Sequence, residues 1–130
     1  MFGAVVLATY DKEFYNDYKD MIDMLIRDYA NPVKDEEYCR FRAYDLYEGH
    51  SWAGGYADND SGNNQESASE SLFSWVSMYL WGVLTENDTY RDAGVFGFTN
   101  EMEAVKQYWF DYDGDNWVEA WPYDVVAQVY

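Results

Sequence analysis

The chain has 130 residues, enough for one domain with a single hydrophobic core and too few for two domains of ordinary size. Aromatic residues make up 21% of the chain, and this apolar area excludes the disordered class even though 25 acidic residues face only 8 basic ones. The formal net charge of −17 disfavours nucleic acid and anionic membranes as partners, because both present phosphate groups, so we expect a neutral or cationic ligand.

The single cysteine and the single histidine limit the chemistry further. Cys39 cannot form a disulfide within the chain, and His50 alone cannot complete a structural zinc site of the His/Cys type. We expect no cofactor and no metal.

Both ends of the sequence are apolar. The first ten residues, MFGAVVLATY, lack a basic region, so they predict neither a complete signal peptide nor a membrane span. They have the pattern of the last part of a helix that starts upstream, and the chain stops on another apolar stretch, WPYDVVAQVY. We therefore expect residues 1–130 to be a fragment of a single larger domain, truncated at both ends.

The first complete helix is predicted at residues 12–30. Apolar residues recur there at three- and four-residue steps, from Phe14 through Ile22 to Tyr29, which is the pattern of one helix face. Asp11 occupies the N-cap position. The helix should end at Asn31-Pro32, because a residue before proline is pushed out of the helical region.

Two more helices are predicted, at about 65–84 and about 88–110. Gly94 and Gly97 should weaken the last helix by roughly 1 kcal/mol each relative to alanine. Because no segment alternates as strands do, the chain is predicted to be all-α. Residues 33–64 show no sustained period and contain four glycines, which predicts a long loop. Loops beyond about 12–15 residues are uncommon in compact domains unless they are functional.

Five segments have a more specific pattern. They are IRDYANP at 26–32, FRAYDLYEGHSWAGG at 41–55, GNNQESASE at 62–70, YLWG at 79–82 and WFDYDGDNW at 109–117. Together, and in this order, they resemble glycoside hydrolase family 81, the endo-acting β-1,3-glucanases. The resemblance implies a partial (α/α)6 barrel with long active-site loops. It also implies hydrolysis of laminarin-type β-1,3-glucan with inversion, by a protein that is secreted or associated with the cell wall.

The resemblance assigns the general base to Glu66 and makes Glu70 the second acidic residue of the same segment. Ala68 and Gly54 stand where the family often has serine, which leaves both carboxylates in place. The general acid of the family is an aspartate in an Asn-Asp-His-His segment that this sequence lacks. The chain is therefore expected to carry the base without the acid, and to need the remainder of the parent polypeptide as a partner.

Spacing limits what the two glutamates can do together. Inverting hydrolysis uses two carboxyl groups about 6.5–9.5 Å apart, whereas residues four apart on one helix face have Cβ atoms about 5–6 Å apart. The pair is thus interpreted as a base and a supporting carboxylate that orients the water or tunes its neighbour. The alternative is that both glutamates only stabilise the first turn of a helix through its dipole.

Four residues are predicted to bind the sugar: Tyr47, His50, Trp52 and Asn64. Aromatic planes pack against the C–H faces of sugar rings, and polar side chains bind hydroxyl groups. A lone histidine beside a tryptophan is more often a structural hydrogen-bonding residue, and this alternative stays open for His50. Trp75, Tyr79 and Trp81 lie in a helical pattern and are expected to be buried between helices.

Other interpretations remain beside the enzyme. The acidic segment DYDGDN at 111–116 is interpreted as a turn rather than a calcium loop, because its glycine is fourth where the EF-hand pattern needs it sixth. The chain could also be a non-catalytic β-1,3-glucan-binding protein that keeps the aromatic residues of the cleft. A weaker alternative is an acidic helical interaction module with no sugar ligand.

Overall fold

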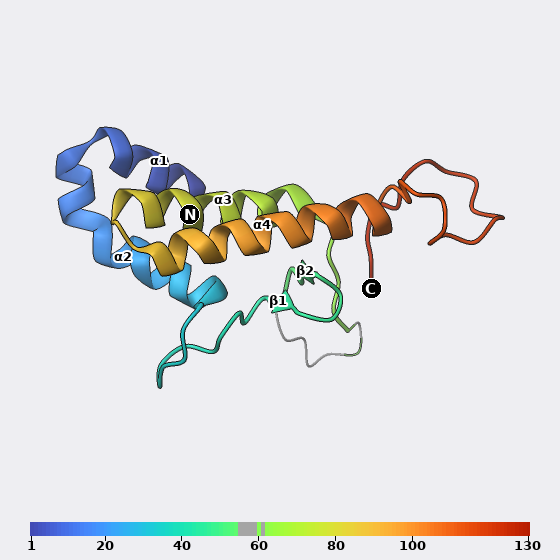
Figure 1. The fold of residues 1–130 in the computed structure, drawn as a ribbon, viewed down its shortest axis with the longest axis horizontal. Helices are drawn as coiled ribbons and strands as arrows, with labels where there is room; N and C mark the ends of the chain where they lie inside the picture. The colour runs from blue at the N-terminus through green and yellow to red at the C-terminus, as the bar shows by residue number, and fades with distance from the viewer. Residues whose placement is uncertain (55–59, 61) are drawn as a thin grey trace.

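The computed structural model describes residues 1–54, 60 and 62–130, and within them the chain is mostly helical (Figure 1). The elements in chain order are α1 (Phe2–Tyr10), α2 (Lys12–Ala30), β1 (Tyr44–Asp45), β2 (His50–Ser51), α3 (Ala68–Leu84) and α4 (Asp88–Tyr108). Helices α3 and α4 lie side by side along the length of the molecule, α1 packs against α2 and α3, and β2 packs against α4. The mostly helical fold agrees with the all-α prediction, while the (α/α)6 barrel stays a prediction.

Helix α2 begins and ends as the sequence predicts, because both signals are local. The carboxylate of Asp11 accepts hydrogen bonds from the backbone N–H groups of Glu13 and Phe14, each at 3.0 Å. The helix ends at Ala30, just before Asn31-Pro32. Along the helix, only one edge of the apolar stripe is buried, through Ile22 and Ile26.

Helix α3 begins at Ala68, so the predicted start at residue 65 was wrong and Glu66 lies outside the helix. The backbone of Gln65 is paired with Val129 instead: the Gln65 N–H donates to the Val129 carbonyl at 3.0 Å, and the Val129 N–H donates back at 3.1 Å. The Glu70 N–H donates to the Ser67 carbonyl at 3.0 Å rather than to that of Glu66. Glu66 and Glu70 therefore do not share a helix face, and only Glu70 lies in the first turn.

Helices α3 and α4 pack closely because α4 carries glycines at the contact. A Cβ at Gly94 would lie 2.5 Å from the backbone nitrogen of Tyr79, and one at Gly97 would lie 2.1 Å from the Trp75 ring. The glycines that weaken the isolated helix are therefore required for this approach. Trp75 and Trp81 are buried as predicted, but Tyr79 is 40% exposed, so that prediction was wrong.

The predicted long loop contains a small antiparallel hairpin in which Tyr44 pairs with Ser51 and Asp45 with His50. Strands of two residues are too short for an alternating pattern to be visible in the sequence. Residues 109–130 extend past the end of α4 and then return, so that Val129 reaches Gln65 (Figure 1). None of the described helices combines the length and the apolar character needed to cross a membrane.

Candidate active site

A cavity of about 260 Å³ opens where the hairpin, the end of α2 and the start of α3 meet. Its wall combines a carboxylate, a guanidinium group, aromatic rings and several hydroxyl groups. Among its lining residues are Tyr29, Arg42, Ser51, Trp52, Gln65 and Glu70. This mixture of an acidic group, aromatic faces and hydroxyl groups is suited to a neutral, hydroxyl-rich ligand such as a sugar.

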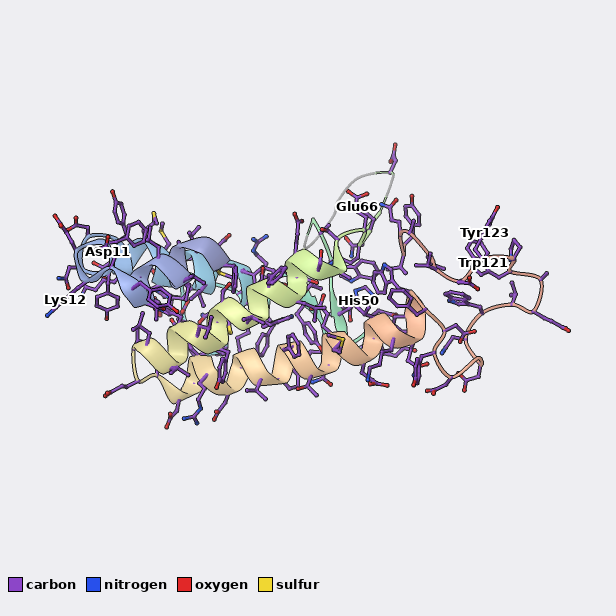
Figure 2. All side chains as sticks on the ribbon, turned by 90° about the horizontal axis from the view of Figure 1, so that it is seen from above. Asp11, Lys12, His50, Glu66, Trp121 and Tyr123 are labelled. Atoms are coloured by element: carbon purple, nitrogen blue, oxygen red, sulfur yellow. The ribbon has the colours of Figure 1, made fainter. Side chains whose placement is uncertain are left out.

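The two predicted catalytic residues differ in how they meet this cavity. Glu70, in the first turn of α3, lines it. Glu66 lies between two lining residues, Gln65 and Ser67, but its own side chain is exposed and does not line the cavity. Figure 2 shows Glu66 on the segment that enters α3 and His50 nearer to α4. The catalytic roles of both glutamates stay predictions.

Trp52 lines three cavities. Its indole N–H donates to a carboxylate oxygen of Asp45 at 3.1 Å, and this hydrogen bond is the main cause that lowers the pKa of Asp45. Besides lining the cavity next to Glu70, Trp52 lines a second cavity of about 390 Å³ together with His50, Trp117 and Tyr130. Trp52, which is half-buried, thus lies in the wall of both spaces, and its role as a sugar platform stays a prediction.

His50 is buried in a cage of aromatic rings and is only 1% exposed. Its ring packs edge-on against Trp52, with 4.5 Å between ring centroids, and against Trp109, with 5.3 Å. Its Nδ1 lies 3.0 Å from the Ser51 carbonyl oxygen. These contacts give His50 a structural role, while contact with a sugar through the second cavity stays a prediction.

The structure does not bring Tyr47 or Asn64 to either cavity among the described lining residues. Tyr47 lies at the turn of the hairpin and is 91% exposed, with its backbone N–H donating to Asp45. Asn64 is half-buried, and its carbonyl accepts a hydrogen bond from the Ala53 N–H at 2.9 Å. A role in sugar binding stays a prediction for both.

The acidic segment at 111–116 forms a turn around the Asp111 carboxylate. That carboxylate accepts hydrogen bonds from the backbone N–H groups of Asn116 at 2.8 Å and Trp117 at 3.3 Å. The Asn116 hydrogen bond is the main cause of the lowered pKa of Asp111. Over the described part of the chain, no three His, Cys, Asp or Glu side chains are grouped so that they could hold a metal ion.

Sequence reasoning missed Glu101, whose side chain is fully buried behind the cavity. Its carboxylate accepts hydrogen bonds from the N–H and the hydroxyl group of Ser51 and from the indole N–H of Trp75. Burial, followed by the negative charge of Glu101, raises the pKa of Tyr44 to about 12. Glu101 follows Gly94 and Gly97 at helical spacing in the sequence, but only the packing of α3 against α4 shows that this face is buried.

Two known proteins are similar to this chain over most of its length. A glucan endo-1,3-beta-D-glucosidase of Acetivibrio thermocellus is 42% identical over 111 residues, which cover 85% of this chain and 14% of that protein. A glucan endo-1,3-beta-D-glucosidase of Thermobifida fusca is 36% identical over 131 residues, which cover 98% of this chain and 17% of that protein. The chain thus spans about one-seventh to one-sixth of the length of these relatives.

A solved structure shows the same fold. It is a mutant glycoside hydrolase family 81 protein from Clostridium thermocellum, which aligns with a TM-score of 0.87 at 37% identity. The alignment covers 97% of this chain and 18% of that one. Residues 1–125 also match the model of the glycosyl hydrolase family 81 C-terminal domain. The resemblance inferred from the five sequence segments is confirmed, and this chain belongs to glycosyl hydrolase family 81.

Proposed function

We propose that this chain is the base-bearing part of an inverting endo-β-1,3-glucanase that hydrolyses laminarin-type glucan. Glu66 is the general base, Glu70 is its supporting carboxylate, and the general acid lies outside residues 1–130. The proposal rests on membership of the family and on one observation in particular. Glu70 and Trp52 line the same cavity, which places a carboxylate next to an aromatic face.

In this mechanism, the base removes a proton from a water molecule that attacks the anomeric carbon opposite the leaving oxygen. Because Glu66 precedes α3, helix geometry does not place the Glu66 carboxylate on the same face as Glu70. One carboxylate can therefore take the proton while the other orients the same water. Trp52 packs against a sugar ring, and the hydroxyl groups of the wall bind sugar hydroxyls.

The two glutamates can be told apart in the full-length protein. Glu66→Gln keeps the shape of the side chain but cannot accept a proton, so kcat on laminarin should fall roughly 10²- to 10⁴-fold while binding survives. Glu70→Gln should cost less and shift one limb of the pH profile. Glu103→Gln, an exposed glutamate on α4, is the matched control and should leave kcat unchanged.

Azide rescue is the sharper test. In Glu66→Ala, the small azide anion can occupy the vacated space and replace the water, giving a glycosyl azide of inverted configuration. Rescue should be strong for Glu66→Ala and weak for Glu70→Ala, and the opposite pattern would mean that the base is assigned to the wrong residue. A protein that binds laminarin but releases no reducing ends would instead be the non-catalytic glucan-binding protein. Failure to be retained on a glucan column would favour the acidic interaction module.

A further inference from the structure

Glu101 is a buried acidic residue that has no part in the proposed hydrolysis. It lies in the C-terminal half of α4, and its exposed fraction is 0%. One carboxylate oxygen, Oε1, accepts the Ser51 N–H at 3.0 Å. The other, Oε2, accepts the Ser51 hydroxyl at 2.8 Å and the Trp75 indole N–H at 2.5 Å. A single side chain on α4 is thus bonded to β2 and to α3.

These hydrogen bonds replace an ion pair. Among the described residues, no basic side chain forms a salt bridge with Glu101. Each oxygen instead faces an N–H group, which can only donate, so the acceptor-only carboxylate fits both positions. A buried carboxylate is tolerated only when hydrogen bonds replace its lost hydration, and here three donors do so.

The network continues from Ser51 toward the proposed base. The Ser51 carbonyl accepts a hydrogen bond from the Gln65 side-chain amide at 2.7 Å. The other end of that amide, Oε1, accepts the Ser67 N–H at 3.2 Å. Gln65 and Ser67 are the two neighbours of Glu66 in the chain. A series of hydrogen bonds thus runs from Glu101 to Ser51, from Ser51 to Gln65, and from Gln65 to the segment that carries Glu66.

We infer that Glu101 is a positioning residue, which sets the orientation of the Glu66 segment against the hairpin through Ser51 and Gln65. This inference rests on the proposed function for its effect on catalysis, but the link between the segments is independent of it. Glu101 is not among the described residues that line either cavity. It therefore acts through other residues rather than by contact with the sugar.

Glu101→Gln in the full-length protein tests the inference. Glutamine has the same shape, but its NH₂ group must face either the Ser51 N–H or the Trp75 N–H, so one donor loses its acceptor. Misplacement of the Glu66 segment should lower kcat on laminarin roughly 10- to 100-fold, with KM changed less than about threefold because Trp52 is untouched. Glu103→Gln is the control and should match the wild type in both constants.

A coupling measurement separates positioning from general damage. Gln65→Met removes the side-chain amide that links Ser51 to the Glu66 segment. If Glu101 acts through Gln65, the double variant should lose no more kcat than the worse single variant. Losses that multiply would overturn the inference. If Glu101→Gln does not fold, Gln65→Met still tests the link, because an unchanged kcat in that variant would overturn the inference.

Hydrogen exchange gives an answer that does not need catalysis. In Glu101→Gln, peptides containing Ser51 and Ser67 should both exchange faster than in the wild type, and in Glu103→Gln neither should change. An unchanged rate at Ser67 would refute the link. If the wild-type protein releases no reducing ends from laminarin, the proposed function fails, and this exchange result still decides whether Glu101 positions the segment.

Discussion

Replacing Gly97 with alanine should open the interface between α3 and α4. The new Cβ would lie 2.1 Å from Cδ2 and 2.3 Å from Cε3 of Trp75, far inside the normal carbon–carbon separation of about 3.5–4.0 Å. The Trp75 ring cannot simply move away, because its N–H is bonded to the buried Glu101 carboxylate. We therefore expect the helices to shift apart and that hydrogen bond to break.

The expected cost follows from three effects. Overpacking costs about 1–3 kcal/mol, loss of a hydrogen bond to a charged group costs about 1.5–3 kcal/mol, and better helix propensity returns about 1 kcal/mol. The net destabilisation is therefore about 1.5–5 kcal/mol. Amides that exchange by opening of this interface should then exchange roughly tenfold to a few thousandfold faster.

Hydrogen exchange of α3 and α4 peptides in the full-length protein measures this directly. Gly3→Ala is the matched control, because no atom beyond its chain neighbours and the local helix backbone lies within 4 Å of a Cβ at Gly3, and the substitution should leave α3 and α4 unchanged. If Gly97→Ala exchanged within a factor of two of the wild type, the inference that glycine is required for close packing would be refuted.

Three further predictions concern pH, the hairpin and the isolated chain. Hydrogen bonds from the Tyr38 N–H and from Arg27 lower the pKa of Asp35 to about 2. Because this folded pKa is below the unfolded one, Asp35 stabilises the protein above about pH 4, and the stabilisation is lost as the pH falls toward 2. Asp35→Asn should therefore lower the urea midpoint at pH 7 and barely change it near pH 2, and an equal loss at both pH values would contradict this reasoning. Asp45→Ala removes the acceptor of the Trp52 indole N–H, so laminarin binding measured by calorimetry should weaken; unchanged affinity would show that this hydrogen bond does not position Trp52 for sugar binding. The isolated 130-residue chain should self-associate in sedimentation experiments and show little activity, since α3 and α4 expose apolar side chains; a sharp cooperative melt from a dilute monomer would count against this expectation. The exposed apolar side chains of these helices include Phe73, Val83, Val95 and Phe96.

The sequence by itself determined the features that depend on neighbouring residues. Helix α2 could be bounded because its cap, Asp11, and its stop, Asn31-Pro32, act within a few residues of the helix ends. The mostly helical character follows from apolar periodicity, which is likewise local. The family was recognisable from five short segments, because specific motifs such as GHSWA at 49–53 do not require knowledge of the fold.

Only the tertiary structure decided the features that join distant parts of the chain. The backbone of Gln65 is hydrogen-bonded to that of Val129, and α3 therefore begins only at Ala68. As a result, Glu66 does not lie on the same helix face as Glu70. No pattern around residue 65 reveals a partner sixty-four positions away. Glu101 looks like one more solvent-exposed acid in a chain with 25 acidic residues, until packing surrounds it with Ser51 and Trp75. Helix propensity counts glycine as a loss, and only the contact between α3 and α4 makes it a requirement, because the close approach of two backbones is a property of the pair of helices rather than of either one.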